Sequence, residues 1–436
     1  MTATKKLREH SFWISEKLKG GKIHAHYQDI LSIVNYYDDP DNKAKKEQYL
    51  NEIIDHAVHT VPYYQNLIGK SINDFPVIDK NIIRQSFNDF RSRSRLYESA
   101  ATLVTSGSTG TPFSIEQDKR KRERNTADTI FFGELAGFTI GQKLFYFKIW
   151  NEINRKGKLA GFIQNIVPFD VRDLSEKHIS EFIKAISKDK SEKSLLAYAS
   201  VFDSICIYLE RIGSVPIHCN LKAIIAMSEA FSISTKKLLL KYFNVHAVSR
   251  YSNVENGILA QQVPDGSNEF VINEASYFFE VLEMNSDNPV TPGTPGRIVI
   301  TDLFNYCMPM IRYDTGDIGT ISQKDVLNYL RPVFKSIEGR KMDLIFDTAG
   351  SLVSSFVITN NMWKYTEIDQ YQFIQLSPKD YMFKINISKP FKREPELIAE
   401  FTQYFGKDAN ISVEYVREIP LLDSGKRKKV VNLCKL

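Results

Sequence analysis

The sequence predicts an α/β protein with a large N-terminal domain of mixed or parallel sheets covered by helices, followed by a small α+β C-terminal domain. Two observations carry this prediction. Residues 221–248 alternate between apolar strand, helix and apolar strand, which is the pattern of a sheet covered by helices. The chain has 436 residues, enough for two or three domains with sizeable cores. We place the domain boundary between residues 1–339 and 340–436.

The composition is that of an ordinary globular protein, with 43% hydrophobic and 25% charged residues. A net charge of +5 permits anionic substrates such as nucleotides but does not demand nucleic acid. The four cysteines lie far apart and form no CxxC pair, which argues against a disulfide framework and favours a reducing cytoplasm. No apolar run has the length of a membrane span, so we expect no stable membrane insertion.

Residues 1–100 are predicted to be a mostly helical segment. Apolar residues within Lys45–Val58 fall on one helix face. Val61 precedes Pro62 and should end that helix, because a residue before proline avoids the α conformation. Asp79 is a candidate N-cap for the next helix.

A polar loop at 103–113 joins the helical segment to the rest of the chain. Its glycines, Gly107 and Gly110, let the backbone approach a ligand closely, and its hydroxyls and N–H groups can surround phosphate oxygens. It is not the P-loop of ATPases, which needs Lys followed by Ser or Thr after its last glycine. A flexible polar loop is the alternative interpretation.

The segments after this loop alternate between helix and strand. Residues 117–136 should be a helix that opens with the basic run 119–124. This run has no interleaved aromatics, so a solvated helix face is favoured over a nucleic-acid patch. Residues 143–150 are predicted to be a buried aromatic strand near a pocket, and residues 195–212 a strand that runs into a helix.

Two polar turns then follow predicted strands. One is Ser228–Ala230, after the strand at 221–227, and the other lies around Tyr251, after a strand at 245–248. Ligands of open α/β sheets bind at the carboxyl ends of strands. A Tyr there can stack on a flat base, and Glu255 can hold a divalent ion. A loop Tyr and an acid at a helix start are the alternative.

Further strands are predicted at 270–282 and 296–302, before the segment Met310–Gly319. Asp317 in this segment is well placed to accept two hydrogen bonds from a ribose diol. Asp-Thr-Gly also occurs in aspartic proteases. Those enzymes need two such segments and this chain has one, so we discount that class.

The C-terminal domain should begin with a hairpin at 344–354 and a strand pair at 371–387. A helix over 395–405 and a final strand at 411–416 complete it. On its own, the run Gly425–Lys429 would be a solvated basic tail or a weak contact with an anionic membrane.

Five segments, in this order and spacing, resemble the adenylate-forming (ANL) superfamily: Thr105–Pro112, Tyr251–Glu255, Tyr313–Asp317, Gly339–Asp343 and Ser424–Lys426. Within the superfamily, the chain looks like the phenylacetate–coenzyme A ligase branch, and more closely its CapK-type capsular polysaccharide relatives. Phe75–Lys80 and Leu196–Ser200 are similar to that branch too. The resemblance covers roughly residues 45–432.

The resemblance implies a site for ATP or AMP and Mg²⁺. The implied nucleotide-binding residues are Thr105, Ser106, Gly107, Ser108, Thr109, Gly110, Thr111, Ser228, Glu229, Ala230, Tyr251, Ser252, Asn253, Asp317 and Arg340. Glu255, helped by Thr109, would bind Mg²⁺. Lys426 would be the catalytic lysine of a mobile C-terminal lid, bridging the substrate carboxylate and the α-phosphate.

Three departures from the family pattern stand out. Thr111 occupies the position where the usual loop carries Lys, and Ser252–Asn253 stand where Gly and Thr or Ser are common. The hinge residue is Lys341 or Asp343, of which we prefer Asp343. We expect these departures to affect the reaction rate and the acyl-transfer step more than they affect nucleotide binding.

The function implied is ATP-dependent adenylation of a carboxylic acid, followed by acyl transfer to an amine, hydroxyl or thiol acceptor in surface polysaccharide assembly. An acyl–coenzyme A ligase is the alternative enzyme, and a non-catalytic nucleotide-binding regulator or scaffold is the alternative of another class. Trp150, Tyr198 and Ser200 are candidate walls of the acid pocket. We expect small-molecule partners, no nucleic acid and a cytoplasmic location. The sequence does not identify the acid or the acceptor. It also leaves open whether the protein forms a homodimer.

Overall fold

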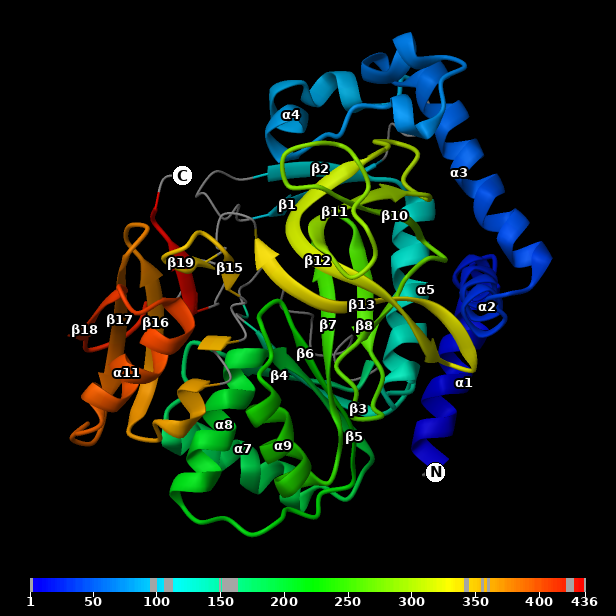
Figure 1. The fold of residues 1–436 in the computed structure, drawn as a ribbon. Helices are drawn as coiled ribbons and strands as arrows, with labels where there is room; N and C mark the ends of the chain where they lie inside the picture. Colours follow the sequence, from blue (N-terminus) through cyan, green and yellow to red (C-terminus); the bar gives the residue numbers. More distant parts are fainter. Residues whose placement is uncertain are drawn as a thin grey trace. The chain divides into compact units, whose positions relative to one another are not determined.

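The computed structural model describes residues 3–94, 100–105, 113–148, 150, 164–340, 345–353, 357–358, 361–420 and 427–434 (Figure 1). The chain divides into two compact units. Unit 1 comprises Met1–Gln142, Ile163–Asn165 and Val248–Ile337. Unit 2 comprises Lys143–Phe162, Ile166–Ala247 and Glu338–Leu436. The functional boundary between residues 339 and 340 stays a prediction.

The N-terminal part of unit 1 is helical, as predicted. Its α-helices are α1 (Ala3–Leu18), α2 (Lys22–Asn35), α3 (Pro40–Thr60) and α4 (Lys80–Gln85). The carboxylates of Asp39 and Asp79 each accept two backbone N–H groups in the first turns of α3 and α4, respectively. Helix α3 ends at Val61, directly before Pro62, as the proline rule predicts.

Unit 1 also contains a sheet whose strands lie in the order β10-β11-β12-β13-β9-β8-β7. The strands are β7 (Ala247–Asn253), β8 (Gly257–Gln262), β9 (Phe270–Ile272), β10 (Tyr277–Leu282), β11 (Pro295–Asp302), β12 (Tyr313–Val326) and β13 (Tyr329–Arg340). Strands β7, β8 and β9 pair antiparallel in turn. A separate antiparallel pair, β1 (Ala101–Thr105) and β2 (Phe113–Gln117), flanks the polar loop.

Helix α5 (Lys119–Leu135) follows β2, and Asp118 caps its N-terminus. Its buried residues Ala127, Phe131 and Phe132 share a hydrophobic cluster with Ile258 and Val271 of the sheet. This packing seats the first turns of α5 beside the β7–β8 hairpin, which carries the candidate site.

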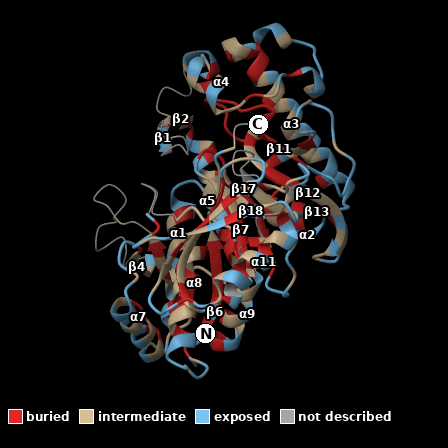
Figure 2. Ribbon diagram, turned by 60° about the vertical axis from the view of Figure 1, so that its left-hand side comes forward, coloured by how far each residue is buried: buried red, intermediate tan, exposed pale blue. Residues whose placement is uncertain are grey.

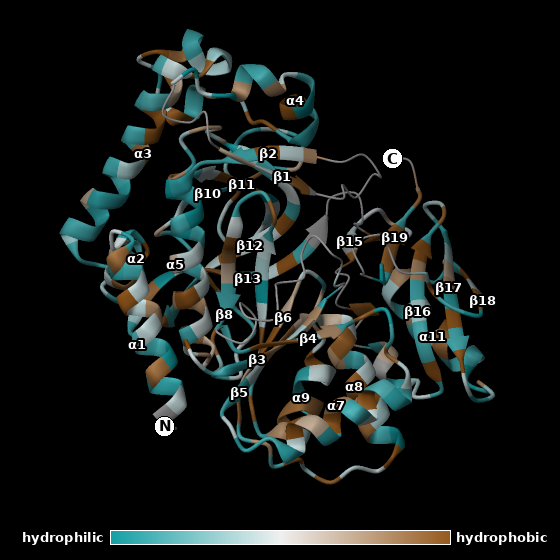
Figure 3. Ribbon diagram, turned by 180° about the vertical axis from the view of Figure 1, so that it is seen from behind, coloured by the Kyte–Doolittle hydropathy of each residue, from teal (hydrophilic) through white to brown (hydrophobic). Residues whose placement is uncertain are grey.

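Unit 2 begins with a four-stranded parallel sheet in the order β6-β5-β3-β4. Its strands are β3 (Lys143–Lys148), β4 (Ile166–Asp170), β5 (Lys193–Tyr198) and β6 (Leu221–Met227). Helices α7 (Glu176–Lys188), α8 (Ala199–Arg211) and α9 (Ile233–Phe243) pack their apolar faces on it. The strands are largely apolar (Figure 3), and the residues of β5 and β6 are mostly buried. The predicted helix-covered sheet is confirmed.

The C-terminal part of unit 2 is the predicted α+β arrangement. Strands β14 (Ile345–Phe346) and β15 (Leu352–Val353) form the expected hairpin. A second sheet has the order β18-β17-β16-β19, built from β16 (Ile368–Gln375), β17 (Asp380–Ile387), β18 (Asn410–Tyr415) and β19 (Val430–Asn432). Helix α11 (Glu394–Phe405) buries Leu397, Phe401 and Phe405 in the core with this sheet. Figure 2 colours the buried residues of the chain red.

Three predicted element boundaries were wrong. Strand β7 continues to Asn253, so Tyr251 lies within the strand and not in a turn after it. The strand predicted at 270–282 is two strands, β9 and β10, separated by a turn at 273–276. The strand at 410–415 is not the last, because β19 pairs parallel with β16. Strand β19 has only three residues, which is too short for a local sequence pattern to predict it.

Candidate functional site

The β7–β8 hairpin carries two of the predicted site residues, Tyr251 and Glu255. The register of the hairpin shifts between Tyr251 and Ser252, and such β-bulges commonly re-aim side chains next to active sites. In the turn, the Asn253 Oδ1 accepts the backbone N–H of Asn256 at 2.8 Å. Glu255 is buried, with 2% of its side chain exposed.

The start of β12 lies against this hairpin and brings Tyr251 and Asp317 together. The Tyr251 hydroxyl lies 2.8 Å from Asp317 Oδ2, to which it donates, and 3.2 Å from Thr315 Oγ1. The Thr315 Oγ1 also accepts the backbone N–H of Asp317. Two segments more than sixty residues apart in sequence therefore meet through direct hydrogen bonds.

Glu255 is held by β12 as well. The Tyr313 hydroxyl donates to Glu255 Oε1 at 3.0 Å. Burial raises the pKa values of the Tyr251 and Tyr313 phenols well above their usual value, and the Asp317 and Glu255 carboxylates act in the same direction. Both hydroxyls therefore stay protonated at neutral pH and act as hydrogen-bond donors to these carboxylates.

Lys80, the first residue of α4, completes the polar cluster around Glu255. Its Nζ lies 2.6 Å from Glu255 Oε1. Sequence reasoning identified Asp79 as a helix cap and missed its neighbour as a site residue. A local sequence pattern does not reveal a partner 175 positions away. The one sequence feature that pointed to Lys80 was the likeness of Phe75–Lys80 to the phenylacetate–coenzyme A ligase branch.

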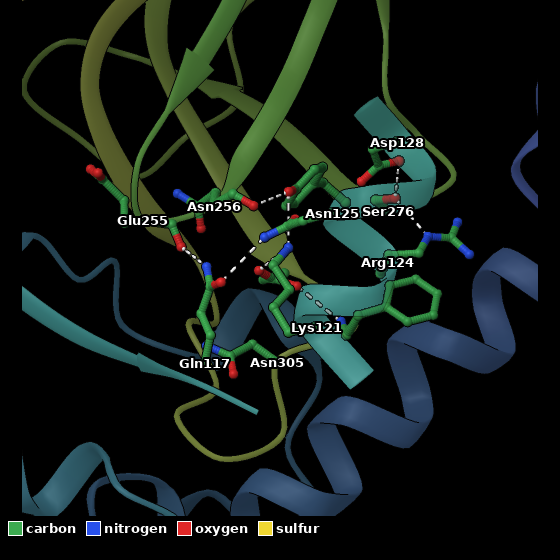
Figure 4. Close-up of polar contacts among 12 residues, drawn as sticks. Gln117, Lys121, Arg124, Asn125, Asp128, Glu255, Asn256, Ser276 and Asn305 are labelled. Carbon is green, nitrogen blue, oxygen red and sulfur yellow. Dashed lines mark hydrogen bonds and ion pairs between the residues drawn. The ribbon is translucent and has the colours of Figure 1, made fainter. Parts of the chain in front are cut away.

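A buried polar network supports the Glu255 turn from below (Figure 4). The Gln117 Nε2 donates to the backbone carbonyl of Glu255 at 2.9 Å. The Tyr277 hydroxyl donates to the carbonyl of Asn256, and Lys121 donates to that hydroxyl at 2.9 Å. Lys121 also pairs with the buried Asp302 at 2.6 Å. The backbone around Glu255 is therefore fixed by side chains of α5 and neighbouring segments.

This network corrects the interpretation of the basic run as a solvated helix face. The side chains of Lys121 and Arg124 are 0% exposed. Arg124 pairs with Asp29 at 2.6 Å and donates to Ser276 and to the carbonyl of Ala275. The prediction failed because these two residues, three apart, face the protein core, where acidic partners from other elements neutralise them.

The predicted adenine-lining turn, Ser228–Ala230, follows β6 in unit 2. Ser228 adopts a left-handed conformation with φ of 70°. The Glu229 Oε2 accepts the backbone N–H of Ser200 at 2.8 Å, and burial raises the pKa of this carboxyl. Ser200 lies in the first turn of α8, so the Ser228–Ala230 turn and the start of α8 are held together.

The candidate pocket residues Tyr198 and Trp150 also lie in unit 2. Tyr198 precedes α8, and burial raises the pKa of its phenol to about 12. The Trp150 Nε1 lies within hydrogen-bond distance of the carbonyls of Tyr146 and Phe169, which tie it to the ends of β3 and β4. Their role as pocket walls stays a prediction.

Mg²⁺ needs oxygen ligands, and the carboxylate of Glu255 is the candidate ligand among the predicted site residues. Within the described residues, no group of three His, Cys, Asp or Glu side chains could hold a metal ion. Glu255 offers a single buried carboxylate. Mg²⁺ in nucleotide sites is commonly held by one or two carboxylates together with substrate phosphates, so Glu255 fits an ion that arrives with a nucleotide.

Comparisons with known proteins agree with this architecture. The model of the CapK C-terminal domain family matches residues 345–433. Protein CapK of Staphylococcus aureus is 23% identical over 387 residues, which are 85% of this chain and 83% of that relative. 2-Hydroxyisobutyryl-CoA ligase in the postadenylation state with 2-HIB-AMP superposes with a TM-score of 0.70 at 13% identity, covering 90% of each chain.

A second ligase gives the same result. The anthranilate CoA ligase AuaEII in complex with anthranoyl-AMP has a TM-score of 0.55 at 14% identity, covering 76% of this chain and 66% of that one. These TM-scores establish the fold. The chain has the fold of these acyl-CoA ligases, and its C-terminal part is similar to the CapK C-terminal domain family.

Several predicted site residues lie outside the described part of the chain. They are Ser106, Gly107, Ser108, Thr109, Gly110, Thr111, Lys341, Asp343 and Lys426. Thr105 and Arg340 are described by their backbones, at the ends of β1 and β13. The roles implied for all of these residues stay predictions.

One more residue was missed in the basic run after Ser424. The sequence suggested no partner for Lys429, yet its ammonium pairs with Asp203 of α8 and 19% of its side chain is exposed. It also lies 5.6 Å from the centre of the Tyr371 ring in β16. Burial acts to lower the pKa of Lys429, but the Asp203 carboxylate outweighs it and the pKa is raised. Lys429 therefore links the C-terminal sheet to α8.

Proposed function

We propose that this chain activates a carboxylic acid with ATP, forming an acyl-adenylate and releasing pyrophosphate. One observation carries the proposal, and it concerns residues chosen from sequence for one nucleotide. Tyr251 hydrogen-bonds to Asp317 and Thr315. Glu255 accepts a hydrogen bond from Tyr313, which lies on the same strand β12 as Thr315 and Asp317. These residues lie in a chain with the adenylate-forming ligase fold.

In this proposal Asp317, Tyr251 and Glu255 each have a distinct role in binding the nucleotide. Asp317 accepts hydrogen bonds from the ribose hydroxyls, and the Tyr251 ring lies against the base. Glu255 holds Mg²⁺, which when bound neutralises charge on the phosphates. The buried donors around Glu255 keep its carboxylate in place before the nucleotide arrives.

The chemistry needs such groups because a carboxylate and a triphosphate repel one another. The substrate oxygen attacks the α-phosphorus, the bond to the bridging oxygen breaks, and pyrophosphate leaves. Positioned donors and cations lower this barrier by neutralising the charge that develops. Lys426 would supply an ammonium at the substrate carboxylate and the α-phosphate.

Two acceptors follow from different relatives. 2-Hydroxyisobutyryl-CoA ligase has been captured with 2-HIB-AMP and CoA, which supports coenzyme A as the thiol acceptor. The likeness to Protein CapK supports instead an amine or hydroxyl acceptor in capsular polysaccharide assembly. The acyl-adenylate is a mixed anhydride and can react with any of these nucleophiles.

A screen of carboxylic acids for ATP-dependent pyrophosphate release tests the proposal. At least one acid should stimulate release, and mass spectrometry should detect its acyl-adenylate. Adding coenzyme A then separates the acceptors, because a ligase yields the thioester. Nucleotide binding without release for any acid would contradict the enzyme and favour a regulator or scaffold.

A further inference from the structure

Helix α1 has an apolar stripe on its exposed side. The residues of this α1 stripe, Leu7, Ile14 and Leu18, are 67%, 60% and 83% exposed. They are spaced by seven and four residues, so they lie along one face of the helix. Single exposed apolar residues are ordinary, whereas a contiguous apolar surface marks an interaction site.

The opposite side of α1 already has its packing partners. The Trp13 ring meets His24 edge-on, with 5.2 Å between ring centres, and lies 5.7 Å from the ring of Tyr27, both on α2. The Glu16 Oε1 accepts the backbone N–H of Ile23 at 2.8 Å. Helix α2 in turn shares a hydrophobic cluster with α5 and the sheet of unit 1. The α1 stripe is therefore a second apolar surface, which the core of unit 1 does not use.

The exposed charges beside the α1 stripe are positive. Among residues 4–20, the exposed side chains that carry a charge at neutral pH are those of Lys6, Lys17 and Lys19. The acidic residues of the helix do not offset them, because Glu16 is buried and Glu9 is partly buried. An aliphatic stripe bordered by lysines is typical of a helix that lies in the interface of an anionic bilayer.

The same charges disfavour a second copy of the chain as the occupant of this face. In a two-fold contact, the α1 stripe of one copy would meet the same stripe of the other. The lysines of both copies would then face each other, and like charges across an interface oppose binding. A surface of anionic lipid headgroups has the complementary charge.

We propose that the exposed face of α1 docks this protein onto the surface of an anionic lipid bilayer. The α1 stripe enters the boundary between headgroups and acyl chains, and the lysines beside it keep their ammonium groups at the level of the headgroups. The helix lies in the plane of the interface, so binding is reversible and depends on both the apolar stripe and the charge. The proposal uses none of the residues assigned to nucleotide binding and stands apart from the proposed function.

Co-sedimentation of the full-length protein with lipid vesicles tests the proposal. Vesicles of equal parts phosphatidylcholine and phosphatidylglycerol are compared with vesicles of phosphatidylcholine alone. Wild type should bind the anionic vesicles at least about 10-fold more tightly than the neutral ones. A rise in ionic strength should weaken this binding, because salt screens the lysine charges.

Replacing the α1 stripe tests the apolar part of the proposal. A variant that combines Leu7→Ser, Ile14→Ser and Leu18→Ser should bind anionic vesicles about 10- to 100-fold more weakly than wild type. The matched control is Ile68→Ser, at a residue of the same unit that is 60% exposed. It should change the affinity less than about 3-fold.

A second variant tests the charge independently. Combining Lys6→Gln, Lys17→Gln and Lys19→Gln should weaken binding to anionic vesicles about 10- to 100-fold. Lys70→Gln, at an exposed lysine outside α1, is the control and should change the affinity less than about 3-fold. Thermal unfolding verifies that each variant folds. The lysine variant decides the test if the serine variant does not fold.

Three results would overturn the proposal: no binding of wild type to anionic vesicles, equal binding to both kinds of vesicle, or unchanged binding in the serine and lysine variants. Light scattering examines the other occupant. A wild-type dimer that becomes a monomer in the serine variant would assign the α1 stripe to a second copy and would also overturn the proposal. The same oligomeric state in wild type and the serine variant supports the bilayer as the occupant.

Discussion

The buried carboxylate of Glu255 accepts a hydrogen bond from the Tyr313 hydroxyl and forms an ion pair with Lys80. Burying an ionised carboxylate costs free energy unless a positive charge and hydrogen-bond donors compensate it. At Glu255 the ammonium of Lys80 and the hydroxyl of Tyr313 do so. In the proposed function, this carboxylate is the ligand of a divalent ion that arrives with the nucleotide.

Glu255→Gln should therefore reduce acid-dependent pyrophosphate release about 100-fold while leaving AMP affinity nearly unchanged. The amide still accepts from Tyr313 but binds Mg²⁺ poorly. Titration of release against Mg²⁺ measures the effect, with Glu47→Gln on the exposed face of α3 as the control. Normal Mg²⁺ dependence in Glu255→Gln would remove Glu255 from the metal role.

Glu229 provides a prediction about pH. Burial raises the pKa of its carboxyl, so the ionised form is disfavoured in the folded protein. Because the folded state holds the proton more tightly, the stabilisation that protonated Glu229 contributes is present below the usual pKa of 4.5. It is lost as the pH rises through the raised value.

Glu229→Gln should accordingly unfold at a higher temperature than wild type at pH 8, and the difference should shrink towards pH 4. The amide oxygen can still accept the N–H of Ser200. Thermal melts at both pH values check this. A difference that grows as the pH falls would mean that the carboxylate is stabilised, not penalised, by its surroundings.

At the scale of elements, α5 connects the core of unit 1 to the candidate site. Lys121 and Arg124 are buried in ion pairs, while Lys119 on the same helix is 77% exposed. Through the Tyr277 hydroxyl, Lys121 reaches the carbonyl of Asn256, the residue after Glu255. A change at Lys121 should thus affect both stability and the site.

Lys121→Met should lower the free energy of unfolding by about 3–5 kcal/mol, because it leaves Asp302 buried without its partner. Urea unfolding measures the loss. The matched control, Lys119→Met, should stay within about 0.5 kcal/mol of wild type. Adding Asp302→Leu to Lys121→Met should recover part of the stability; no recovery would show that the loss has a different cause from the unpaired carboxylate.

Elements whose periodicity is strong were predictable from sequence. Residues 221–227 form β6 with the bounds expected, and helix α9 follows it as the predicted alternation of strand and helix requires. The order of motifs in the sequence selected Tyr251, Glu255 and Asp317, which the structure places on β12 and the β7–β8 hairpin; their role in nucleotide binding stays a prediction. Lys80 and the burial of Lys121 were not predictable, since each depends on a carboxylate brought in by a distant segment.

At the scale of the whole molecule, unit 1 contains the polar residues around Tyr251, Glu255 and Asp317, and unit 2 contains helix-covered parallel strands and a C-terminal sheet. Within the described ranges, no helix combines the length and apolar character that crossing a bilayer requires. In unit 2, the pairs from Lys429 to Asp203 and from Arg211 to Asp369 tie α8 to the C-terminal sheet.

Lys429→Met should weaken this connection, because Asp203 is then left partly buried without its cation. Limited proteolysis should cleave the C-terminal part, from residue 338 onward, several-fold faster than in wild type. The exposed Lys407 provides the matched control in Lys407→Met. Equal cleavage rates in wild type and Lys429→Met would show that the ion pair does not hold the C-terminal sheet.

Pyrophosphate–ATP exchange is the direct measurement of whether Tyr251 and Asp317 serve adenylation, as proposed. With an acid identified by the screen, wild type should incorporate labelled pyrophosphate into ATP only when that acid is present. Asp317→Asn, which cannot accept both ribose hydroxyls, should lose most of this exchange while keeping its fold. Exchange that persists unchanged in Asp317→Asn, or that never depends on an acid, would contradict the account.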